Sequence, residues 1–129
     1  MVTLIKMFYL KFECRVIVDN HLSESFTVKS GVRQGCIISP ILFLVAVDWV
    51  IWQTTAGKPR GIPWTPFTYL QDLDFADDLA VLSTNTTHLQ EKTDRLNTFS
   101  NQVGLNISTS KTKVMSICST TNSQIFVNS

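Results

Sequence analysis

The sequence predicts an α+β fold, in which an antiparallel sheet has its helices packed on one face. The first observation is the order of the expected elements: a helix, a hairpin, a buried helix, a second hairpin, another helix and a strand. Short connections between such elements favour antiparallel pairing over a parallel sheet with crossover helices. The second observation is that 129 residues with 44% hydrophobic content suffice for one core without disulfide bonds.

The composition narrows the classes of protein to consider. Charged residues make up 16% of the chain, and the mean hydropathy of +0.14 excludes a disordered or acidic-tail protein. The net charge of +1 argues against a free-standing nucleic-acid binder, which is usually more basic. Cys14, Cys36 and Cys118 lack the spacing of metal ligands, so we expect small buried residues in a reducing compartment.

No segment has the features of a secretion signal or a membrane span. The most apolar run, residues 41–47, ends at Asp48 and is far shorter than the ~20 residues that a membrane helix needs. Lys6 interrupts the N-terminal segment, which has no small-residue cleavage site. We therefore expect a soluble, intracellular chain.

The first part of the chain predicts a helix followed by a hairpin. Residues 2–11 fit a short helix, and the alternation of apolar and polar residues over 12–18 is typical of a half-buried strand. Asp19 and Asn20 supply turn chemistry. Residues 25–29 then return as the second strand of the hairpin.

The middle of the chain predicts a loop and a buried helix. Residues 31–38 form the loop. Ser39 is expected to cap the following helix with its hydroxyl, and Pro40 to occupy the first helical position. This helix, which continues through Trp52, is apolar almost all round, and that pattern indicates burial. Residues 57–66, with three prolines and two glycines, predict an irregular connection.

The rest of the chain predicts a second hairpin, a helix and a strand. Two apolar runs, residues 68–75 and 79–83, flank the tip of the hairpin. Thr87 and Gln90 resemble a capping box at the start of a helix that Gly104 ends. Two segments complete the chain: an expected closing strand (113–118) and an expected polar, frayed tail (119–129).

Four acidic residues lie within seven positions around the second hairpin: Asp72, Asp74, Asp77 and Asp78. Two carboxylates ~4 Å apart repel by about 1 kcal/mol in water and by about 4 kcal/mol near a protein surface. An exposed tip tolerates the smaller repulsion, so solvated turn residues are one interpretation. The flanking apolar strands favour the larger value unless a cation is present, and hard oxygen ligands suit Mg²⁺. Residue types alone leave both interpretations open.

The loop before the buried helix is a second candidate site. Gly31 and Gly35 allow the backbone to come close to a ligand, and Arg33 and Gln34 could contact a phosphate or a base edge. Taken alone, the pattern favours a plain loop before a capped helix. A third segment, residues 104–113, is by itself a glycine-ended helix followed by a polar loop with surface lysines.

The three segments contain three motifs in a fixed order. They are Gly31-Val32-Arg33-Gln34-Gly35 with Ser39-Pro40, Leu73-Asp74-Phe75-Ala76-Asp77-Asp78, and Gly104-Leu105-Asn106-Ile107 with Lys111-Thr112-Lys113. In this order they closely resemble the palm of LINE-type (non-LTR) retrotransposon reverse transcriptases. An Ala-Asp-Asp turn is common, whereas three ordered motifs are specific. The resemblance extends from about residue 25 to residue 117, and it implies that residues 1–118 form a partial palm domain with an antiparallel palm-type sheet.

The resemblance assigns the catalytic and metal-binding roles to three residues. Asp77, the first of the acidic pair, would ligate the catalytic Mg²⁺, and Asp78 would support the metal or the primer end. Lys111 matches the lysine near the triphosphate, where it would neutralise charge or donate a proton. The reaction implied is a two-metal nucleotidyl transfer.

The resemblance also implies the substrates and partners. Gln34 and Gly35 would shape the pocket for nucleotide and template, with Arg33 adjacent to it. The parent protein would be an RNA-directed DNA polymerase of the nucleus or cytoplasm, without a membrane partner. It would bind an RNA template, a DNA primer and dNTPs, and it would add nucleotides to the primer 3′-hydroxyl.

One departure from the family pattern concerns the metal site. The family needs a further aspartate on an earlier palm strand, and nothing before Gly31 fits it. Asp19, fifteen positions before Gln34, leads directly into turn residues and is expected at a distal hairpin turn. The two-metal site is thus incomplete, and we expect the chain alone to be inactive. Two alternatives stay open: a non-catalytic retroelement remnant or domesticated binding module, and a small Mg²⁺- or Ca²⁺-binding α+β domain in which Gln34 and Lys111 have no role.

Overall fold

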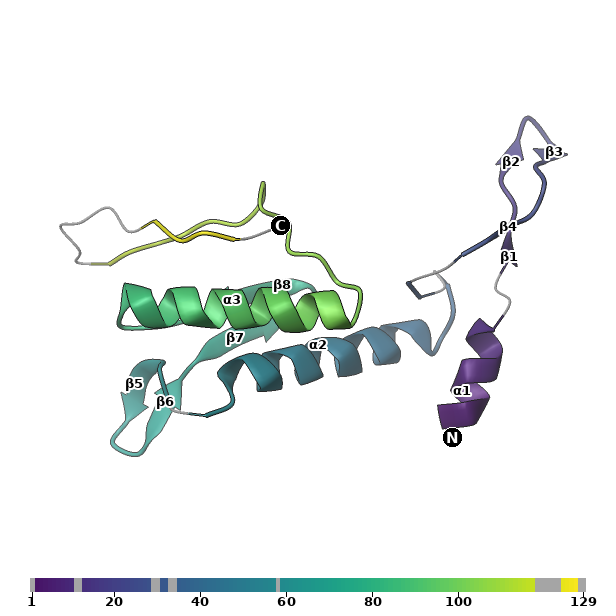
Figure 1. Cartoon of the computed structure of the whole chain (residues 1–129). Helices are drawn as coiled ribbons and strands as arrows, with labels where there is room; N and C mark the ends of the chain where they lie inside the picture. Colours follow the sequence, from purple (N-terminus) through teal and green to yellow (C-terminus); the bar gives the residue numbers. More distant parts are fainter. Residues whose placement is uncertain are drawn as a thin grey trace. The chain divides into compact units, whose positions relative to one another are not determined.

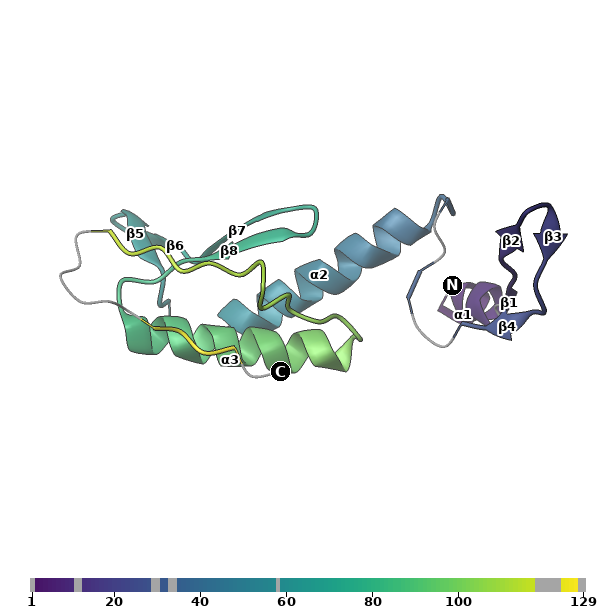
Figure 2. The ribbon, with the colours of Figure 1, turned by 90° about the horizontal axis from the view of Figure 1, so that it is seen from above.

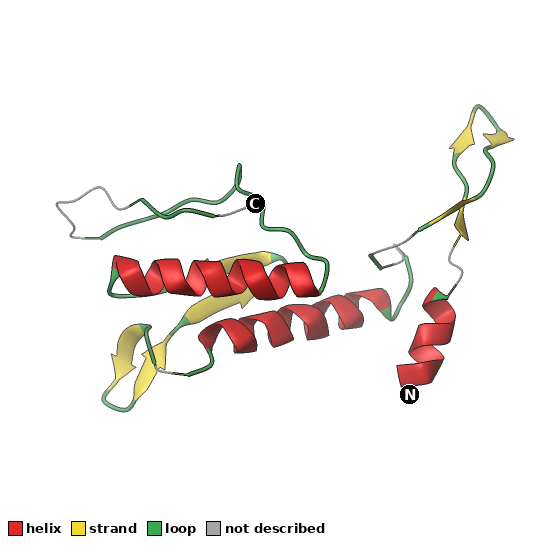
Figure 3. Ribbon diagram, in the orientation of Figure 1, coloured by secondary structure: helices red, strands yellow, loops and turns green. Residues whose placement is uncertain are grey.

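The computed structural model describes residues 2–10, 13–28, 31–32, 35–57, 59–117 and 124–127. Within these ranges the chain forms three helices and four antiparallel strand pairs, which confirms the predicted α+β class (Figure 3). The chain divides into two compact units, Met1–Arg33 and Gln34–Ser129, and each is described by itself.

The first unit contains the predicted helix and hairpin (Figure 1). In chain order its elements are α1 (Val2–Tyr9), β1 (Glu13–Cys14), β2 (Ile17–Val18), β3 (His21–Leu22) and β4 (Phe26–Thr27). The strand β1 pairs with β4, and β2 pairs with β3. The prediction of a half-buried face is wrong, because Val16, Val18 and Phe26 are exposed. In the described residues of this unit, no second layer covers that face of the short two-stranded ribbon.

Asp19 and Asn20 form the two-residue turn between β2 and β3. Their φ angles are 48° and 64°, so both lie in the left-handed region. Aspartate and asparagine tolerate this region because their short polar side chains bond locally to the backbone. The position of Asp19 in a hairpin turn is therefore confirmed.

The helix α2 (Ser39–Thr55) of the second unit begins one residue earlier than predicted. Its N-cap residue is Ile38, which makes no side-chain capping bond, and the expected capping role of Ser39 is wrong. Ser39 is instead buried as the first helical residue, while Pro40 still lies in the first turn, where a missing N–H costs nothing.

The prediction that α2 is a buried helix is also wrong. One face of the helix exposes large apolar side chains, and Val50 is the single buried apolar residue in the part of the chain that the structure describes. The neighbouring helix α3 (Thr86–Gln102) covers only one side, where Trp49 meets Phe99 edge-on at 5.8 Å between ring centroids. The exposed members of the other face are Ile41, Leu44, Val45 and Trp52.

The helix α3 starts at a side-chain cap and ends at a glycine. Asn85, not Thr87, is the N-cap, and its Oδ1 accepts a hydrogen bond from the Thr87 N–H at 2.8 Å. Gln90 turns away from the helix start, so the capping box is wrong. Its amide instead bonds to the backbone N–H and C=O of Phe126. The predicted end is confirmed: Gly104 follows the last turn with φ +77°, and the Leu105 N–H closes on the Ser100 carbonyl.

Two hairpins lie on one side of the α2–α3 pair, which is clear when Figures 1 and 2 are compared. The first is β5 (Ile62–Thr65) with β6 (Thr68–Leu70), and the second is β7 (Asp72–Phe75) with β8 (Asp78–Val81). The expected irregular connection is therefore wrong over residues 62–65, which form a strand. Gly61, the residue before β5, lies so close to β6 that a Cβ there would be 2.1 Å from the Leu70 carbonyl oxygen.

The strands do not join into one sheet. The ladders β5–β6 and β7–β8 meet at Gln71, but each keeps its own partner. The expected closing strand is absent from residues 113–117, which are irregular, and Cys118 lies outside the described residues. The boundary predicted at residue 118 stays a prediction.

Candidate active-site hairpin

The predicted acidic tip is a two-residue turn between β7 and β8. Phe75 pairs with Asp78 as the last rung of the ladder, so Ala76 and Asp77 alone make the turn. Apolar residues alternate with acids along β7, which is typical of a strand with two different faces. The hairpin that the sequence predicts here is confirmed at its tip, whereas residues 68–70 of its expected first arm form β6 and pair with β5 instead.

The backbone of this turn does not suit its residues. Ala76 has φ 57°, in the left-handed region, where a side chain with a Cβ costs roughly 1–2 kcal/mol. Glycine is the usual residue at such a position in a hairpin turn. Residues held in a strained conformation occur preferentially at ligand clamps and active sites. The strain at Ala76 therefore favours a functional role for the adjacent Asp77 and Asp78.

The four acids of the hairpin fall into two environments. Asp74, Asp77 and Asp78 are exposed, whereas Asp72 is half-buried at the base of the hairpin. Burial raises the pKa of Asp72, the charge of Asp74 on the same strand face raises it further, and Lys92 opposes both effects. The tip thus presents two adjacent carboxylates to solvent.

The hairpin offers hard oxygen donors but only part of a metal site. Asp77 and Asp78 supply the carboxylate oxygens that Mg²⁺ prefers. No group of three or more His, Cys, Asp or Glu residues that could hold a metal ion occurs in the ranges that the structure describes. Asp77 and Asp78 therefore fit the ion chemically and would need further ligands from outside these ranges.

The other predicted site residues are described in part. Gly35 is exposed in the turn before α2 with φ +81°, and Lys111 is exposed in a turn closed by a 3.1 Å bond from its N–H to the Ser108 carbonyl. Arg33 and Gln34 lie outside the described residues. Among Gly35, Asp77, Asp78 and Lys111, all of which the structure describes, no hydrogen bond or ion pair joins one to another.

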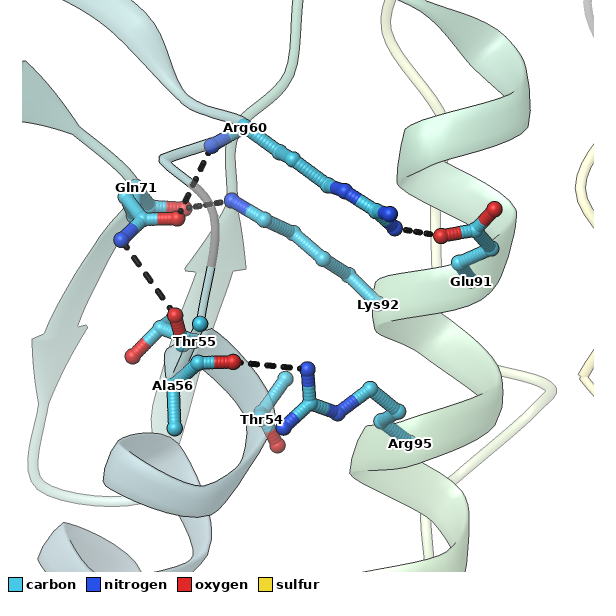
Figure 4. Close-up of a pocket in the computed structure, with 9 residues that line it drawn as sticks. Thr54, Thr55, Ala56, Arg60, Gln71, Glu91, Lys92 and Arg95 are labelled. Carbon is cyan, nitrogen blue, oxygen red and sulfur yellow. Dashed lines mark hydrogen bonds and ion pairs between the residues drawn. The ribbon is translucent and has the colours of Figure 1, made fainter.

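Sequence reasoning missed a polar junction at the base of the hairpin (Figure 4). The Nζ of Lys92, a buried residue of α3, donates to the carbonyl of Gln71 at 3.2 Å and to that of Leu82 at 2.9 Å. The Gln71 side chain accepts from the Arg60 N–H at 3.3 Å and donates to the Thr55 carbonyl at 3.4 Å. A usable signal existed: Lys92 interrupts the apolar stripe of α3, three positions after Leu89.

A second cation ties α3 to the end of α2. The guanidinium of Arg95 donates to the Ala56 carbonyl at 2.8 Å and to the Gln53 carbonyl, two acceptors that the helix leaves free at its C-terminus. Beside it, Arg60 forms an ion pair with Glu91. These groups line a cavity of about 350 Å³ between α2, α3 and the hairpin base.

Residues 1–126 match the reverse transcriptase (RNA-dependent DNA polymerase) family. The chain belongs to this family. This chain is also 31% identical over 67 residues to the retrovirus-related Pol polyprotein from type-1 retrotransposable element R2 of Popillia japonica. Those residues are 52% of this chain and 11% of the relative, so the chain spans about a tenth of the curated relative that it matches.

The match confirms the predicted LINE-type reverse transcriptase resemblance. At the family level the lineage is that of an RNA-directed DNA polymerase, and reverse transcriptases generally use divalent metal ions. No helix in the described ranges of this reverse transcriptase segment is long and apolar enough to cross a membrane.

Proposed function

We propose that the chain supplies the acidic hairpin of a retrotransposon reverse transcriptase palm. In a longer polypeptide it would take part in Mg²⁺-dependent transfer of nucleotides from dNTPs to a primer 3′-hydroxyl on an RNA template. The observation that carries the proposal is the β7–β8 turn, which holds two adjacent carboxylates at an exposed tip despite the strain at Ala76.

Asp77 and Asp78 would hold Mg²⁺ together with ligands from the rest of the polypeptide. When bound, the ion neutralises phosphate charge and lowers the pKa of the attacking hydroxyl. The hairpin contributes by holding Asp77 in the turn and Asp78 on the last rung of the hydrogen-bonded ladder, so that both carboxylates need little reorganisation when a substrate arrives.

The remaining residues would act on the nucleotide and the template. We assign Lys111 to the triphosphate, where an exposed ammonium offsets negative charge. Gly35, with its left-handed φ, would let the backbone approach the nucleotide and template closely, with Gln34 and Arg33 beside it. By this proposal the 129-residue chain does not polymerise alone, because two carboxylates and water hold Mg²⁺ weakly.

The test is primer extension on an RNA template by a chimera in which residues 35–117 replace the matching stretch of the Popillia japonica R2 polyprotein. Asp77→Asn should reduce extension by more than the ~10²–10³-fold typical of one lost electrostatic donor, because it misplaces a metal. Asp74→Asn is the matched control and should be mild, since Asp74 is a strand-surface acid. Equal losses of extension from Asp77→Asn and Asp74→Asn would mean that the proposal assigns the metal to the wrong carboxylate.

Two further outcomes separate this function from its alternatives. An inactive chimera beside an active unmodified polyprotein would favour a non-catalytic remnant or binding module. Robust extension by the 129-residue chain alone, abolished by Asp19→Asn, would show that the metal site is complete without other segments.

A further inference from the structure

The orientation of the β7–β8 hairpin depends on its base. Beyond Asp72 the side chains of β7 are exposed, so that the outer half of the strand has little packing to hold it. At the base, the Leu82 N–H donates to the Gln71 carbonyl at 2.9 Å and closes the open end of the ladder. Leu79 and Val81 of β8, the strand that neighbours α3, are half-buried and supply part of the packing, whereas the polar contacts that fix the direction of the hairpin act near Gln71 and Leu82.

Lys92 acts on both strands at this point. Its Nζ donates to the carbonyls of Gln71 and Leu82, the two residues that close the ladder. The side chain is 3% exposed, so a charged group is buried against two backbone acceptors, and such charge-assisted bonds are stronger than neutral ones. The ammonium thus joins the hairpin base to α3.

The same helix is joined to α2 one turn further along. Arg95 bonds to the last carbonyls of α2, and the Gln71 side chain bonds to the Thr55 carbonyl of α2 from the other direction. Lys92, Arg95 and Gln71 therefore connect three elements: the β7–β8 hairpin, α2 and α3 (Figure 4).

We infer that Lys92 is a positioning residue for the acidic tip, acting through the carbonyls of Gln71 and Leu82. The inference rests on the proposed function of Asp77 and Asp78. Gln71 is five residues from Ala76, about 17 Å at strand spacing, so a tilt of ~10° at the base moves the tip by about 3 Å. A shift of ~1 Å at a reacting centre can cost about 10²-fold in rate.

The first test is NMR on the 129-residue chain. Residual dipolar couplings of the amides of residues 73–79 and of α3 should fit one alignment tensor in the native protein. In Lys92→Met, which keeps the stem and loses the donors, the couplings of the hairpin should no longer fit that tensor, while α3 still does. Lys92→Arg keeps the donors and should restore the fit, and Lys6→Met, the same change at an exposed lysine of α1, should change nothing.

The second test measures the effect on the reaction in the chimera. Lys92→Met should lower kcat for primer extension by about 10- to 100-fold, with KM for dNTP little changed, because the tip moves but the nucleotide contacts do not. Lys92→Arg should recover most of the loss. If Lys92→Met and Lys92→Arg lower kcat by the same factor, Lys92 contributes only to general stability, and the inference is overturned.

The two tests fail separately. If the unmodified chimera does not extend a primer, the proposed function fails, and the dipolar couplings still decide whether Lys92 orients the hairpin. If the hairpin of the native chain already moves independently of α3, the inference is overturned whatever the chimera does. That native measurement also decides the question if Lys92→Met does not fold.

Discussion

The hairpins β2–β3 and β7–β8 both turn in two residues, and both place an aspartate in the turn. In the first, Asp19 and Asn20 both have positive φ, and their residue types suit that backbone. In the second, Ala76 occupies a left-handed position that glycine normally fills, and Asp77 follows it. Both residues of the β2–β3 turn suit its backbone, whereas Ala76 does not suit the left-handed position that it occupies in the β7–β8 turn.

This difference separates two aspartates that look alike in the sequence. A turn whose residue types suit its backbone is explained by folding alone, whereas a strained residue is more frequent at ligand clamps and active sites. The comparison therefore agrees with the metal role that we propose for Asp77, and it gives no such role to Asp19.

The largest effect should come from giving both hairpins the same ideal turn. Asn-Gly is the preferred two-residue turn, so Asp19→Asn with Asn20→Gly should leave β2–β3 formed, and Ala76→Asn with Asp77→Gly should leave β7–β8 formed, by NMR chemical shifts of the strands. In the chimera, however, the exchange at positions 76 and 77 should reduce primer extension by more than ~10²–10³-fold. If the chimera with the exchanged residues 76 and 77 still extends a primer, the β7–β8 turn does not carry the proposed function.

A smaller effect is expected when the β2–β3 turn loses its suitable residue. Asn20→Ala places a Cβ without a polar group in the left-handed region and should destabilise this hairpin by about 1–2 kcal/mol. Faster hydrogen exchange of the backbone amides of β2 and β3 measures it. Unchanged exchange would mean that the turn does not limit this hairpin.

Replacing the strained residue of the β7–β8 turn with glycine should stabilise that hairpin. Ala76→Gly relieves the left-handed strain but gives the unfolded chain more freedom, so a net gain of about 0.5–1 kcal/mol is expected for β7–β8. Urea unfolding of the 129-residue chain measures it, with Ala80→Gly, in the middle of β8, as the destabilising control. A loss of stability on Ala76→Gly would show that the turn carries no strain.

The smallest effect is a pH dependence confined to the base of β7–β8. Burial and Asp74 raise the pKa of Asp72, so the folded chain holds this proton more tightly than the unfolded one. The resulting stability is complete below the ordinary pKa of 3.8 and is lost as pH rises through the raised pKa.

Asp72→Asn should remove that component. The free energy of unfolding of the native chain, relative to the variant, should fall as pH rises over this window. Urea unfolding at a series of pH values provides the curve, and Asp48→Asn, an exposed acid of α2, controls for the loss of one negative charge. A relative stability that rises with pH would mean that Lys92 outweighs burial at Asp72.

Local patterns in the sequence predicted two of the hairpin turns and one helix end, but not the β5–β6 hairpin. The turn at Asp19 and Asn20 and the acidic tip at Ala76 and Asp77 follow from residue types within a few positions, and so does the helix end at Gly104. The first turn and the helix end depend on the backbone preferences of single residues, whereas the acidic tip follows from the apolar runs on either side of it.

Features that depend on distant neighbours were not predictable in this way. An apolar helix indicates burial, but the pattern cannot say which residues cover it, and one face of α2 has no cover in the described part of the chain. The junction at Lys92 was missed for a related reason, since its acceptors are backbone carbonyls that every residue possesses. Only the three-dimensional path of Gln71 and Leu82 selects them.

Gly61 adds a constraint on how this region can diverge among related sequences. A Cβ at this position would meet backbone atoms of Leu70 and Gln71, which cannot rotate away as a side chain would. A relative with any other residue at this place must therefore space its β5 and β6 strands differently or give up the rung at Leu70. Because Gln71 is the next residue, that respacing would also displace the base of the acidic hairpin, so one missing side chain couples the geometry of two consecutive ladders.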